Sequence, residues 1–504
     1  MSEWTGPAQL GESMASRRAK WLAIAVIVFA TVIGGGLRLH DLGGGGVWFD
    51  ELYTIRDVSP ENTGYSPTRW LGYQPTKWLL AAQGVEPSAI PGERYDLYQS
   101  LGITTQKARL ASCLIGLFMI PLFGWAAWRP LGPAVAAMLA VLVALCVWNV
   151  SWSQVARFYT QVGLFGGLAI LFYLDAIKTG CRWRFAASTV LVVLAYLTHP
   201  PAITIGGALA LDGLVQLIRR RPTGYRVWGW SWALASMAVC IAILIYERVN
   251  EKRGYDTFVG GQAMQSHSVP DIVVYLFIML TPVLAFAALV GLVAGRRHRA
   301  VWVLGYAALI PVVVIAAVSV SGGFSHYRYT YVSMIGWLGL AAVGVWYLSV
   351  ALRDRVGPML AWSPAALLVV GMMPQLGSYL TTGNRFVEPF HLAWAAVGER
   401  IEPGDAVFSE RTEIAEYYLQ RDDVLDLPGA LDLIDEQAAG RRAWLVRLSA
   451  SSTGRRHWPL SSADRMQLID RGVNAVWLPY REVSVYLLSP PEPEMQEDFE
   501  EARP

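Results

Sequence analysis

Residues 21–39 read WLAIAVIVFATVIGGGLRL, and residues 47–53, just beyond, read VWFDELY. The first stretch is an apolar run of about 20 residues, the length that an α-helix needs to cross a bilayer. The second stretch places two adjacent carboxylates, Asp50 and Glu51, directly after that run. Carboxylates beside a membrane are costly to remove from water, so a pair in this position indicates a functional role.

Similar apolar runs recur along most of the 504 residues. Hydrophobic residues make up 54% of the chain and charged residues only 16%, whereas a soluble protein would have about 25% charged residues. The region from Arg385 onward differs, because it holds 22 of the 39 acidic residues but only 13 of the 41 basic ones. The composition therefore predicts a basic membrane part and an acidic soluble part.

The cysteines indicate neither a metal site nor a disulfide framework. They lie in or beside apolar runs and form no Cys-x-x-Cys pair, at Cys113, Cys146, Cys181 and Cys240. This distribution is typical of small core residues. Nucleic-acid-binding motifs are also absent from the sequence, so no nucleic-acid partner is expected.

Hydrophobic periodicity predicts about eleven membrane spans. They cover residues 21–39, 108–128, 133–150, 157–177, 184–198, 201–218, 227–246, 271–294, 300–320, 329–350 and 359–380. The pair Pro200-Pro201 breaks a helix and so separates the fifth span from the sixth. The first span is predicted to be an uncleaved anchor rather than a signal peptide, because no small-residue cleavage site follows it.

Loop charge predicts the direction of the chain. One set of loops is basic and alternates strictly with loops of low basic content; it holds Arg17, Arg18, Lys20, Arg129, Lys178, Arg182, Arg184, Arg219, Arg220, Arg221, Arg226, Arg296, Arg297, Arg299, Arg353 and Arg355. The positive-inside rule places this set in the cytoplasm. Residues 1–20 are then cytoplasmic and, because the number of spans is odd, the C-terminal region lies outside.

Two outer bodies follow from this topology. Within a transmembrane domain at 21–384, the loop 40–107 is too polar to span and is expected to include short helices on the membrane surface. Residues 385–490 show short strand patterns at 406–408, 443–446, 475–478 and 483–488, and helical patterns at 387–401 and 411–420. These patterns indicate a small α/β domain. The tail 491–504, rich in Pro and Glu, is predicted to be disordered.

Four polar clusters share the predicted outer face. They are Asp50-Glu51, the stretch SWSQVARFY at 151–159, Thr198-His199-Pro200-Pro201, and Ser325-His326-Tyr327-Arg328-Tyr329. Carboxylates act as general bases or metal ligands, and the planar fork of arginine binds phosphate. This inventory suits transfer of a group from a phosphate-bearing donor to a hydroxyl.

Each cluster also has a structural explanation when it is taken alone. Asp50-Glu51 could begin a surface helix, and Arg157 and Arg328 could be span-end residues whose charged heads reach water. Similarly, His199 could simply end a helix, and Lys77 could lie at the membrane interface. The occurrence of all these clusters on one predicted face favours a common site.

In these motifs the chain resembles the GT-C membrane glycosyltransferases, the group that contains protein O-mannosyltransferases and the bacterial aminoarabinose transferase of lipid A. The first span followed by Asp50-Glu51 fits that family, as does the opening of the next span at 109–112, which reads RLAS. The stretch 152–159 corresponds to a Tyr-Ser-Gln-Glu-Ala-Arg-x-Tyr motif. Further matches are Thr198-His199, Arg328-Tyr329 and the turn EPGD at 402–405.

The chain departs from the family pattern in two places. Val155 stands where the family has a Glu, and YQPTK at 73–77 replaces a His-Pro-Pro-Leu-Tyr stretch. Two other functions remain open, because outward arginines and carboxylates also suit transport and Val155 allows an inactive protein. One is a transporter or flippase for a lipid-linked or anionic substrate, and the other is an inactive GT-C member that serves as a scaffold.

The resemblance implies a polytopic α-helical membrane protein of GT-C type with an extracytoplasmic C-terminal α/β domain, located in a bacterial cytoplasmic membrane. It implies an inverting glycosyltransferase that moves a sugar from a polyprenyl-phosphate donor to a hydroxyl of a lipid, glycan or protein acceptor. A nucleotide-sugar donor is not expected, because the sequence has no Gly-rich phosphate loop of the Rossmann type.

The resemblance also implies roles for individual residues. Asp50 is expected to be the general base, with Glu51 in support. The donor phosphate would be bound by Arg157, Arg328 and Lys77, and the rest of the substrate by Gln154, Tyr159, His199, His326 and Tyr329. A divalent cation, Mg²⁺ or Mn²⁺, could be held by Asp50, Glu51 and His199.

Overall fold

The computed structural model describes residues 14–59, 70–218, 238, 242, 245, 268–321, 326–382, 390–427, 431–438, 441–450, 466–472 and 481–488. The chain divides into two compact units. The helical unit comprises Met1–Gly43, Asn62–Pro87 and Gln106–Gly383, and the mixed unit comprises Gly44–Glu61, Ser88–Thr105 and Asn384–Pro504. The predicted outer loop 40–107 is thus shared between them, and Asp50-Glu51 belongs to the mixed unit.

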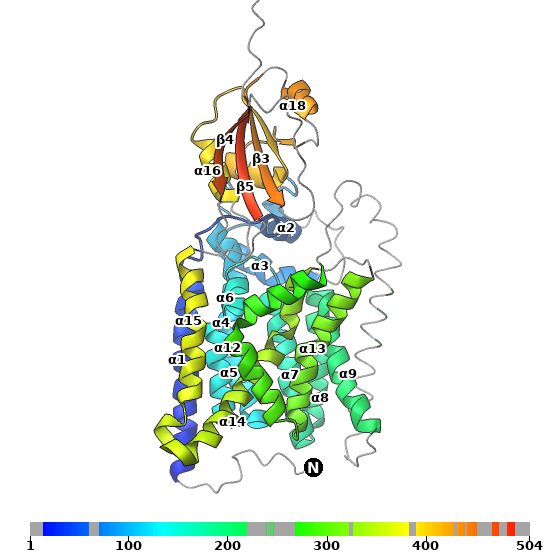
Figure 1. Ribbon diagram of the computed structural model, residues 1–504. Coiled ribbons are helices and arrows are strands. Elements are labelled where there is room, and N and C mark those ends of the chain that lie inside the picture. Colours follow the sequence, from blue (N-terminus) through cyan, green and yellow to red (C-terminus); the bar gives the residue numbers. More distant parts are fainter. Residues whose placement is uncertain are drawn as a thin grey trace, which may run out of the picture. The chain divides into compact units, whose positions relative to one another are not determined.

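The helical unit is built almost entirely of long helices (Figure 1). Its α-helices are α1 (Met14–Leu39), α3 (Trp70–Ala82), α4 (Thr105–Leu131), α5 (Pro133–Leu145), α6 (Val147–Ser153), α7 (Tyr159–Thr179), α8 (Arg182–Thr198), α9 (Ile203–Ile218), α12 (Val269–Ala294), α13 (Arg299–Val320), α14 (Met334–Leu360) and α15 (Ser363–Thr382). Two 3₁₀ segments join them, η4 (Pro200–Ala202) and η5 (Tyr327–Ser333).

Among the described residues, six helices are long and apolar enough to cross a membrane, or seven if the bent pair α5 and α6 is one span. Large apolar side chains on these helices face outward, including Phe29, which is 67% exposed, and Phe277, which is 59% exposed. Such surfaces are unfavourable in water and are satisfied by lipid. The predicted fold class, a polytopic helical membrane protein, is confirmed.

The predicted spans coincide with helices wherever the structure describes them, whereas of the span 227–246 only residues 238, 242 and 245 are described. The break at Pro200-Pro201 is confirmed, because α8 ends at Thr198 and α9 begins at Ile203. Both helices are short, with 17 and 16 residues. The total of eleven spans therefore stays a prediction.

Glycines allow the helices of this unit to approach closely. A Cβ atom on Gly291 of α12 would lie 2.0 Å from the carbonyl oxygen of Leu340 in α14, and one on Gly344 of α14 would lie 2.0 Å from the carbonyl oxygen of Ala287. The two backbones are therefore in direct contact. Small residues of this kind allow van der Waals packing between membrane helices, where no hydrophobic effect drives association.

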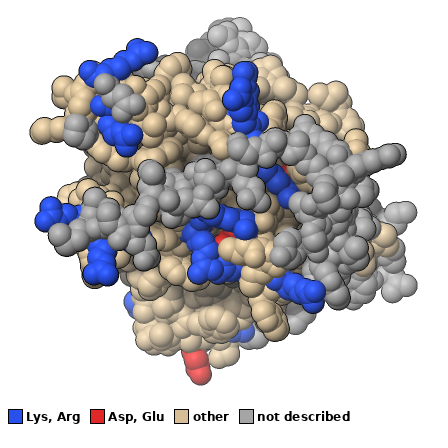
Figure 2. All heavy atoms as spheres, turned by 90° about the horizontal axis from the view of Figure 1, so that it is seen from below, with Lys and Arg blue, Asp and Glu red and all other residues tan. Residues whose placement is uncertain are grey.

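One end of the helical unit is strongly basic. Figure 2 looks onto the end at which α1 begins and shows Lys and Arg spread across it, with very little Asp or Glu in view. Lys178, in the last turn of α7, donates a hydrogen bond to the carbonyl oxygen of Arg129 at 2.7 Å, and Arg184, at the start of α8, pairs with Asp175 near the end of α7. Basic residues thus gather at one end of the spans in the described structure, as the alternating loop charges predict.

The mixed unit contains a five-stranded sheet with the order β2-β1-β3-β5-β4 (Figure 1). Its strands are β1 (Ala406–Ser409), β2 (Leu425–Asp426), β3 (Ala443–Ala450), β4 (Met466–Gly472) and β5 (Arg481–Leu488). Its helices are α2 (Phe49–Val58), α16 (Phe390–Gly398), α17 (Thr412–Leu419) and α18 (Leu431–Ala438), with the 3₁₀ segments η2 (Pro87–Ala89), which begins at the boundary of the units, and η3 (Tyr95–Leu97).

The sheet is parallel on one side and antiparallel on the other. Strand β1 pairs in parallel with β2 and β3, whereas β5 pairs in antiparallel with β3 and β4. The predicted strands at 406–408, 443–446 and 483–488 and both predicted helices are observed. The predicted strand 475–478 and the tail 491–504 lie outside the described residues. Strands β2 and β4 and helix α18 were not predicted.

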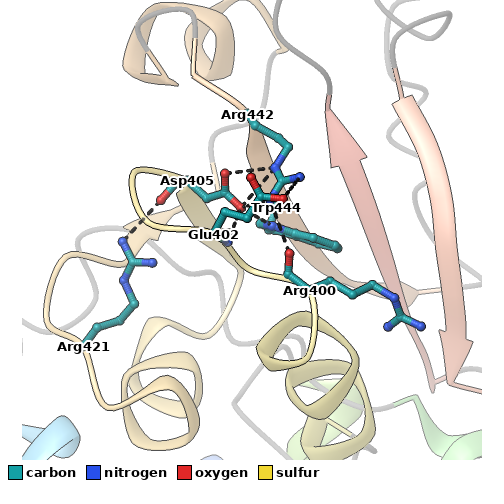
Figure 3. Close-up of polar contacts among 6 residues, drawn as sticks. All are labelled: Arg400, Glu402, Asp405, Arg421, Arg442 and Trp444. Atoms are coloured by element: carbon teal, nitrogen blue, oxygen red, sulfur yellow. Dashed lines mark hydrogen bonds and ion pairs between the residues drawn. The ribbon is translucent and has the colours of Figure 1, made fainter.

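A buried carboxylate joins the turn before β1 to strand β3 (Figure 3). Asp405 accepts hydrogen bonds from Arg442 Nε at 3.0 Å, from Trp444 Nε1 at 2.8 Å and from the backbone N–H of Glu402 at 2.9 Å. Arg442 also pairs with Glu402 at 2.9 Å. Burial would raise the pKa of Asp405, but these hydrogen bonds outweigh it and hold the pKa below its usual range. We call Glu402, Asp405, Arg442 and Trp444 the Asp405 network.

Candidate functional site

The site in the helical unit begins with a broken helix. Helices α5 and α6 are bent by 55° at Cys146. The bend releases backbone carbonyls, and within a membrane these must find donors inside the protein. Arg38 of α1 donates to the carbonyl oxygens of Val143 at 2.9 Å and Ala144 at 3.2 Å, and Asn149 also donates to Val143 at 3.1 Å.

Asn149 connects this break to the segment that carries Arg328. Its Oδ1 accepts a hydrogen bond of 2.7 Å from the hydroxyl of Tyr331 in η5. Arg38 and Asn149 are both fully buried. The break therefore lies in a polar framework that fixes α1, α6 and η5 to one another.

Residues 154–158 form an irregular turn between α6 and α7, and this turn carries Arg157. Ser112 of α4 anchors it by donating to the carbonyl oxygen of Arg157 at 2.8 Å. The ring of Phe158, in the same turn, packs edge-on against Tyr73 of α3 with centroids 5.7 Å apart. The turn is therefore held from two helices.

The three clusters of the helical unit that the sequence analysis singled out come together around His199. The centroid of its ring lies 4.9 Å from that of Phe158, 5.6 Å from that of Tyr159 and 5.0 Å from that of Tyr329. His199 occupies the extended break between α8 and η4, which the Pro200-Pro201 pair enforces. The three clusters thus form one aromatic site.

Two arginines lie over rings of this same group. The guanidinium carbon of Arg157 is 4.6 Å from the ring centroid of Phe158, and that of Arg328 is 6.0 Å from the ring centroid of Tyr329. Each arginine is only 7% exposed. We call Arg157, Phe158, Tyr159, His199, Arg328 and Tyr329 the ring cluster. In this cluster two guanidiniums lie next to aromatic rings that also contact one another.

His326 shapes the segment that presents Arg328. Its Nδ1 accepts a hydrogen bond of 3.2 Å from the backbone N–H of Arg328, at the start of η5. The neighbouring ring of Tyr327 packs on Tyr275 of α12, with centroids 4.3 Å apart. The geometry therefore gives His326 a capping function beside the ring cluster.

Gln154 is engaged by the end of α1. Its Nε2 donates to the carbonyl oxygens of Leu37 at 3.2 Å, Arg38 at 3.2 Å and His40 at 2.6 Å, and its Oε1 accepts from the hydroxyl of Tyr379. These carbonyls lie in and just past the last turn of α1, where the helix itself no longer supplies N–H donors. The amide of Gln154 thus caps α1 and ties it to α15.

Lys77 lies on α3 and is half-buried. The same helix is joined to α7 by a hydrogen bond of 3.1 Å from Gln161 Nε2 to the carbonyl oxygen of Leu71. It also carries Tyr73, which contacts Phe158 of the ring cluster. The structure thus ties the helix of Lys77 to the ring cluster but gives no contact between Lys77 itself and that cluster.

Asp50 and Glu51 lie in the first turn of α2, in the mixed unit. Glu51 Oε2 accepts a hydrogen bond of 3.0 Å from the backbone N–H of Trp48, which is the reach-back contact of a helix N-terminus. Both side chains are buried, at 5% and 1% exposure. The positive end of the helix dipole favours carboxylates at this position.

The structure does not test the predicted divalent cation. Over the part of the chain that is described, no group of three or more His, Cys, Asp or Glu side chains is placed to hold a metal ion. Glu51 uses one oxygen for the Trp48 amide. The cation therefore stays a prediction, and no step below depends on it.

Several residues that build this site were missed from the sequence. Arg38, Asn149 and Tyr331 form the framework beneath the helix break, and Tyr379 orients Gln154. A lone arginine near the end of an apolar run was a possible signal for Arg38. The others have no pattern of their own, because their partners lie more than 100 positions away along the sequence.

No protein-family profile matches the sequence, and no curated protein is significantly similar to it. Solved structures are similar in fold. ArnT from Cupriavidus metallidurans in the apo state has a TM-score of 0.52 and 14% identity, over 92% of this chain and 97% of that one. The apo oligosaccharyltransferase of Archaeoglobus fulgidus has a TM-score of 0.53 and 11% identity, over 84% of this chain and 69% of that one. Both are GT-C glycosyltransferases, so the fold predicted from the motifs is confirmed.

Proposed function

We propose that the protein is an inverting membrane glycosyltransferase that moves a sugar from a polyprenyl-phosphate donor to an acceptor hydroxyl. The convergence of Arg157, His199 and Arg328 in the ring cluster carries this proposal. Buried arginines beside aromatic rings suit a ligand that is both anionic and apolar, because guanidinium binds phosphate while rings contact the lipid or the sugar. The similarity of the whole fold to two glycosyltransferases supports the same conclusion.

The proposed chemistry needs charge stabilisation on the leaving group. When the bond from the sugar to the phosphate oxygen breaks, negative charge grows on that oxygen. Arg157 and Arg328 would bind the donor phosphate and stabilise this charge, which fixed donors in a water-poor site do strongly. Tyr159, His199 and Tyr329 would contact the sugar or the first part of the lipid.

Asp50 is proposed as the general base that removes the proton of the acceptor hydroxyl. It lies in the first turn of α2 and is 5% exposed. Glu51, which caps the same helix through the Trp48 amide, would hold the first turn in place. Its proposed role is therefore positional, and the proton transfer rests on Asp50.

The orientation of the protein in the membrane is also part of the proposal. The basic end of the helical unit in Figure 2 would face the cytoplasm, by the positive-inside rule. The ring cluster and the mixed unit would then act on the outer side of a bacterial cytoplasmic membrane. The acceptor is a hydroxyl of a lipid, a glycan or a protein at that surface.

The experiment that tests this function measures sugar transfer by the purified full-length protein from a panel of polyprenyl-phosphate sugars. Asp50→Asn should abolish transfer and leave donor binding intact. Asp41→Asn is a matched control, because Asp41 is exposed and its positive φ of 50° suits Asn equally. Transfer that survives in Asp50→Asn would remove Asp50 as the base, and binding without turnover in the wild type would contradict the proposed reaction.

A further inference from the structure

Helix α2, which carries Asp50, is fixed to helix α17, which lies 360 positions later in the sequence. The hydroxyl of Tyr53 donates to Glu413 Oε1 at 2.7 Å. The guanidinium carbon of Arg411 lies 4.4 Å from the ring centroid of Phe49. Asp50 therefore lies between two residues of α2 that are both held by the beginning of α17.

The chain before α2 is fixed in the same way. The backbone N–H of Val47 donates to the hydroxyl of Tyr418 at 2.6 Å. A Cβ atom on Gly46 would lie 2.4 Å from the Cβ of His391 in α16, so only glycine allows this approach. Attachment to the C-terminal region thus begins four residues before Asp50, at Gly46, and continues three residues after it, at Tyr53.

A second segment of the mixed unit supports this arrangement from the far end of α2. Ser59, just past the helix, donates to the carbonyl oxygen of Ile90 at 2.9 Å. Gln99 in turn donates to the carbonyl oxygen of Tyr417 in α17 at 2.8 Å. Both ends of α2 are therefore connected to the C-terminal region, one directly and one through residues 90–99.

A helix of this kind needs such support. Helix α2 has 10 residues, and isolated helices shorter than about 12–15 residues are marginal in water. Phe49 and Tyr53 lie one turn apart on the same face, and their rings pack edge-on with centroids 5.9 Å apart. The contacts of this face with Arg411 and Glu413 determine the rotation of α2, and hence the direction of the Asp50 carboxylate.

The hydroxyl of Tyr53 keeps its proton across the pH range in which an enzyme works. Burial and the neighbouring negative charge of Glu413 raise the pKa of Tyr53 well above its ordinary value. The phenol therefore keeps the proton that it donates.

We propose that the C-terminal α/β region positions the general base, with Arg411 and Glu413 as positioning residues that act on Asp50 through Phe49 and Tyr53. This inference rests on the function proposed above, because it assigns a purpose to the geometry of Asp50. Arg411 and Glu413 act on the acceptor only through α2.

Two single variants of the full-length protein break the hydrogen bond from opposite sides. Tyr53→Phe removes the hydroxyl, and Glu413→Ala removes the acceptor. We expect each to lower kcat by about 10- to 100-fold, because misplacement of a catalytic group by about 1 Å costs roughly 100-fold. The KM for the donor should stay within about twofold, since donor binding is assigned to other residues.

The matched control is Glu436→Ala, which removes an exposed glutamate from α18. It should leave kcat unchanged. Glu413→Gln keeps an acceptor oxygen and should recover much of the activity that Glu413→Ala loses. The double variant Tyr53→Phe with Glu413→Ala should lose no more than one single variant, because both remove the same bond.

Hydrogen exchange measured by mass spectrometry on residues 47–58 provides a readout that does not depend on activity. Exchange in Glu413→Ala should be about tenfold faster than in Glu436→Ala, as loss of a hydrogen bond to a charged group predicts. Unchanged exchange would overturn the attachment of α2, and faster exchange with unchanged kcat would overturn the positioning role. A wild-type protein without lipid-dependent transfer would remove the proposed function and the positioning role with it, while hydrogen exchange would still decide the attachment.

Discussion

Two of the regions that bury charged side chains, the Asp405 network and the ring cluster, satisfy those charges in different ways. In the Asp405 network a carboxylate accepts hydrogen bonds from a guanidinium, an indole and a backbone amide, all within the mixed unit. In the ring cluster two guanidiniums lie against aromatic faces. In the Asp405 network a carboxylate is paired with a guanidinium of the same unit. In the ring cluster two guanidiniums and several aromatic rings lie together.

This difference suggests how to tell a charged side chain that stabilises the fold from one that binds a ligand. Donors that converge on one carboxylate determine both its position and its partners, so the Asp405 network fixes a turn against a strand. A guanidinium near a ring still presents its N–H donors as a planar fork, and this fork selects an anion by direction. We therefore expect variants of the Asp405 network to change stability and variants of the ring cluster to change donor binding.

Among the variants that compare these two regions, the largest effect is expected for Asp405→Asn. The change leaves the Arg442 guanidinium without its main carboxylate, and breaking a buried ion pair costs about 3–5 kcal/mol. Because Arg442 is 27% exposed, we expect a loss near the lower end, about 3 kcal/mol. Hydrogen exchange of the β1 and β3 amides in the full-length protein measures this free energy of unfolding.

The control for that variant is Asp423→Asn, which removes an exposed partner of Arg421 and should cost less than about 1 kcal/mol. The effect should also depend on pH. Because the pKa of Asp405 is lowered on folding, its contribution is present above pH 3.8 and is lost as the pH falls through the folded-state value. Equal losses in the two variants would contradict a special role for the Asp405 network.

Arg328→Ala is expected to weaken donor binding by about 30-fold, or roughly 2 kcal/mol, since a hydrogen bond to a charged group contributes about 1.5–3 kcal/mol. Arg328→Lys should recover only part of this affinity, because an ammonium lacks the planar fork. Binding of an undecaprenyl-phosphate probe to purified protein measures the change. A loss of folding stability with unchanged affinity would show that Arg328 stabilises the fold and does not bind the donor.

Glu416→Gln tests a group with the opposite sign of pH dependence. Burial, with the negative charges of Glu413, Asp96 and Asp422, raises the pKa of Glu416 to about 7. The wild-type mixed unit should therefore lose stability as the pH rises from 4.5 to 7, because the folded state holds the proton more tightly. The variant should be more stable than the wild type at pH 8 by about 1 kcal/mol.

The measurement for this prediction is the hydrogen-exchange stability of α17 at pH 5 and pH 8, after correction for the intrinsic rate of exchange. The wild type and the Glu416→Gln variant should converge at the lower pH. Parallel curves for the two proteins would show that Glu416 does not titrate in this range.

The smallest effect is expected for Gln154→Ala, which removes the cap of α1. Side-chain hydrogen bonds between membrane helices contribute about 0.6 kcal/mol on average, so the melting temperature should fall by only a few degrees. Affinity for the undecaprenyl-phosphate probe should be unchanged within about twofold. A loss of affinity like that of Arg328→Ala would instead place Gln154 in the binding site, as the sequence analysis predicted.

The ring cluster shows where sequence reasoning succeeds and where it ends. The stretches around Arg157, His199 and Arg328 were predicted to share one face, and the structure brings them into one set of ring contacts. Their common side follows from the alternation of spans and loop charges. Their contact distances do not, because they depend on the bend at Cys146 and on the break at His199.

Gln154 and Glu51 show what motif chemistry alone does not predict. Both were expected at the site for their chemistry, and the structure uses the amide of the first to cap α1 and a carboxylate oxygen of the second to bind the Trp48 amide. A polar side chain in a motif forms hydrogen bonds with the backbone groups that the fold places beside it. That choice is not encoded in local spacing.

The sequence by itself determined the membrane fold, the basic end of the helical unit, most of the strands of the mixed unit and the break at Pro200-Pro201, because hydrophobic period, loop charge and proline geometry act locally along the chain. Only the tertiary structure decided which unit carries Asp50. The contacts of Phe49 and Tyr53 with Arg411 and Glu413 join residues about 360 positions apart, and such pairings arise from packing of surfaces that no local pattern records.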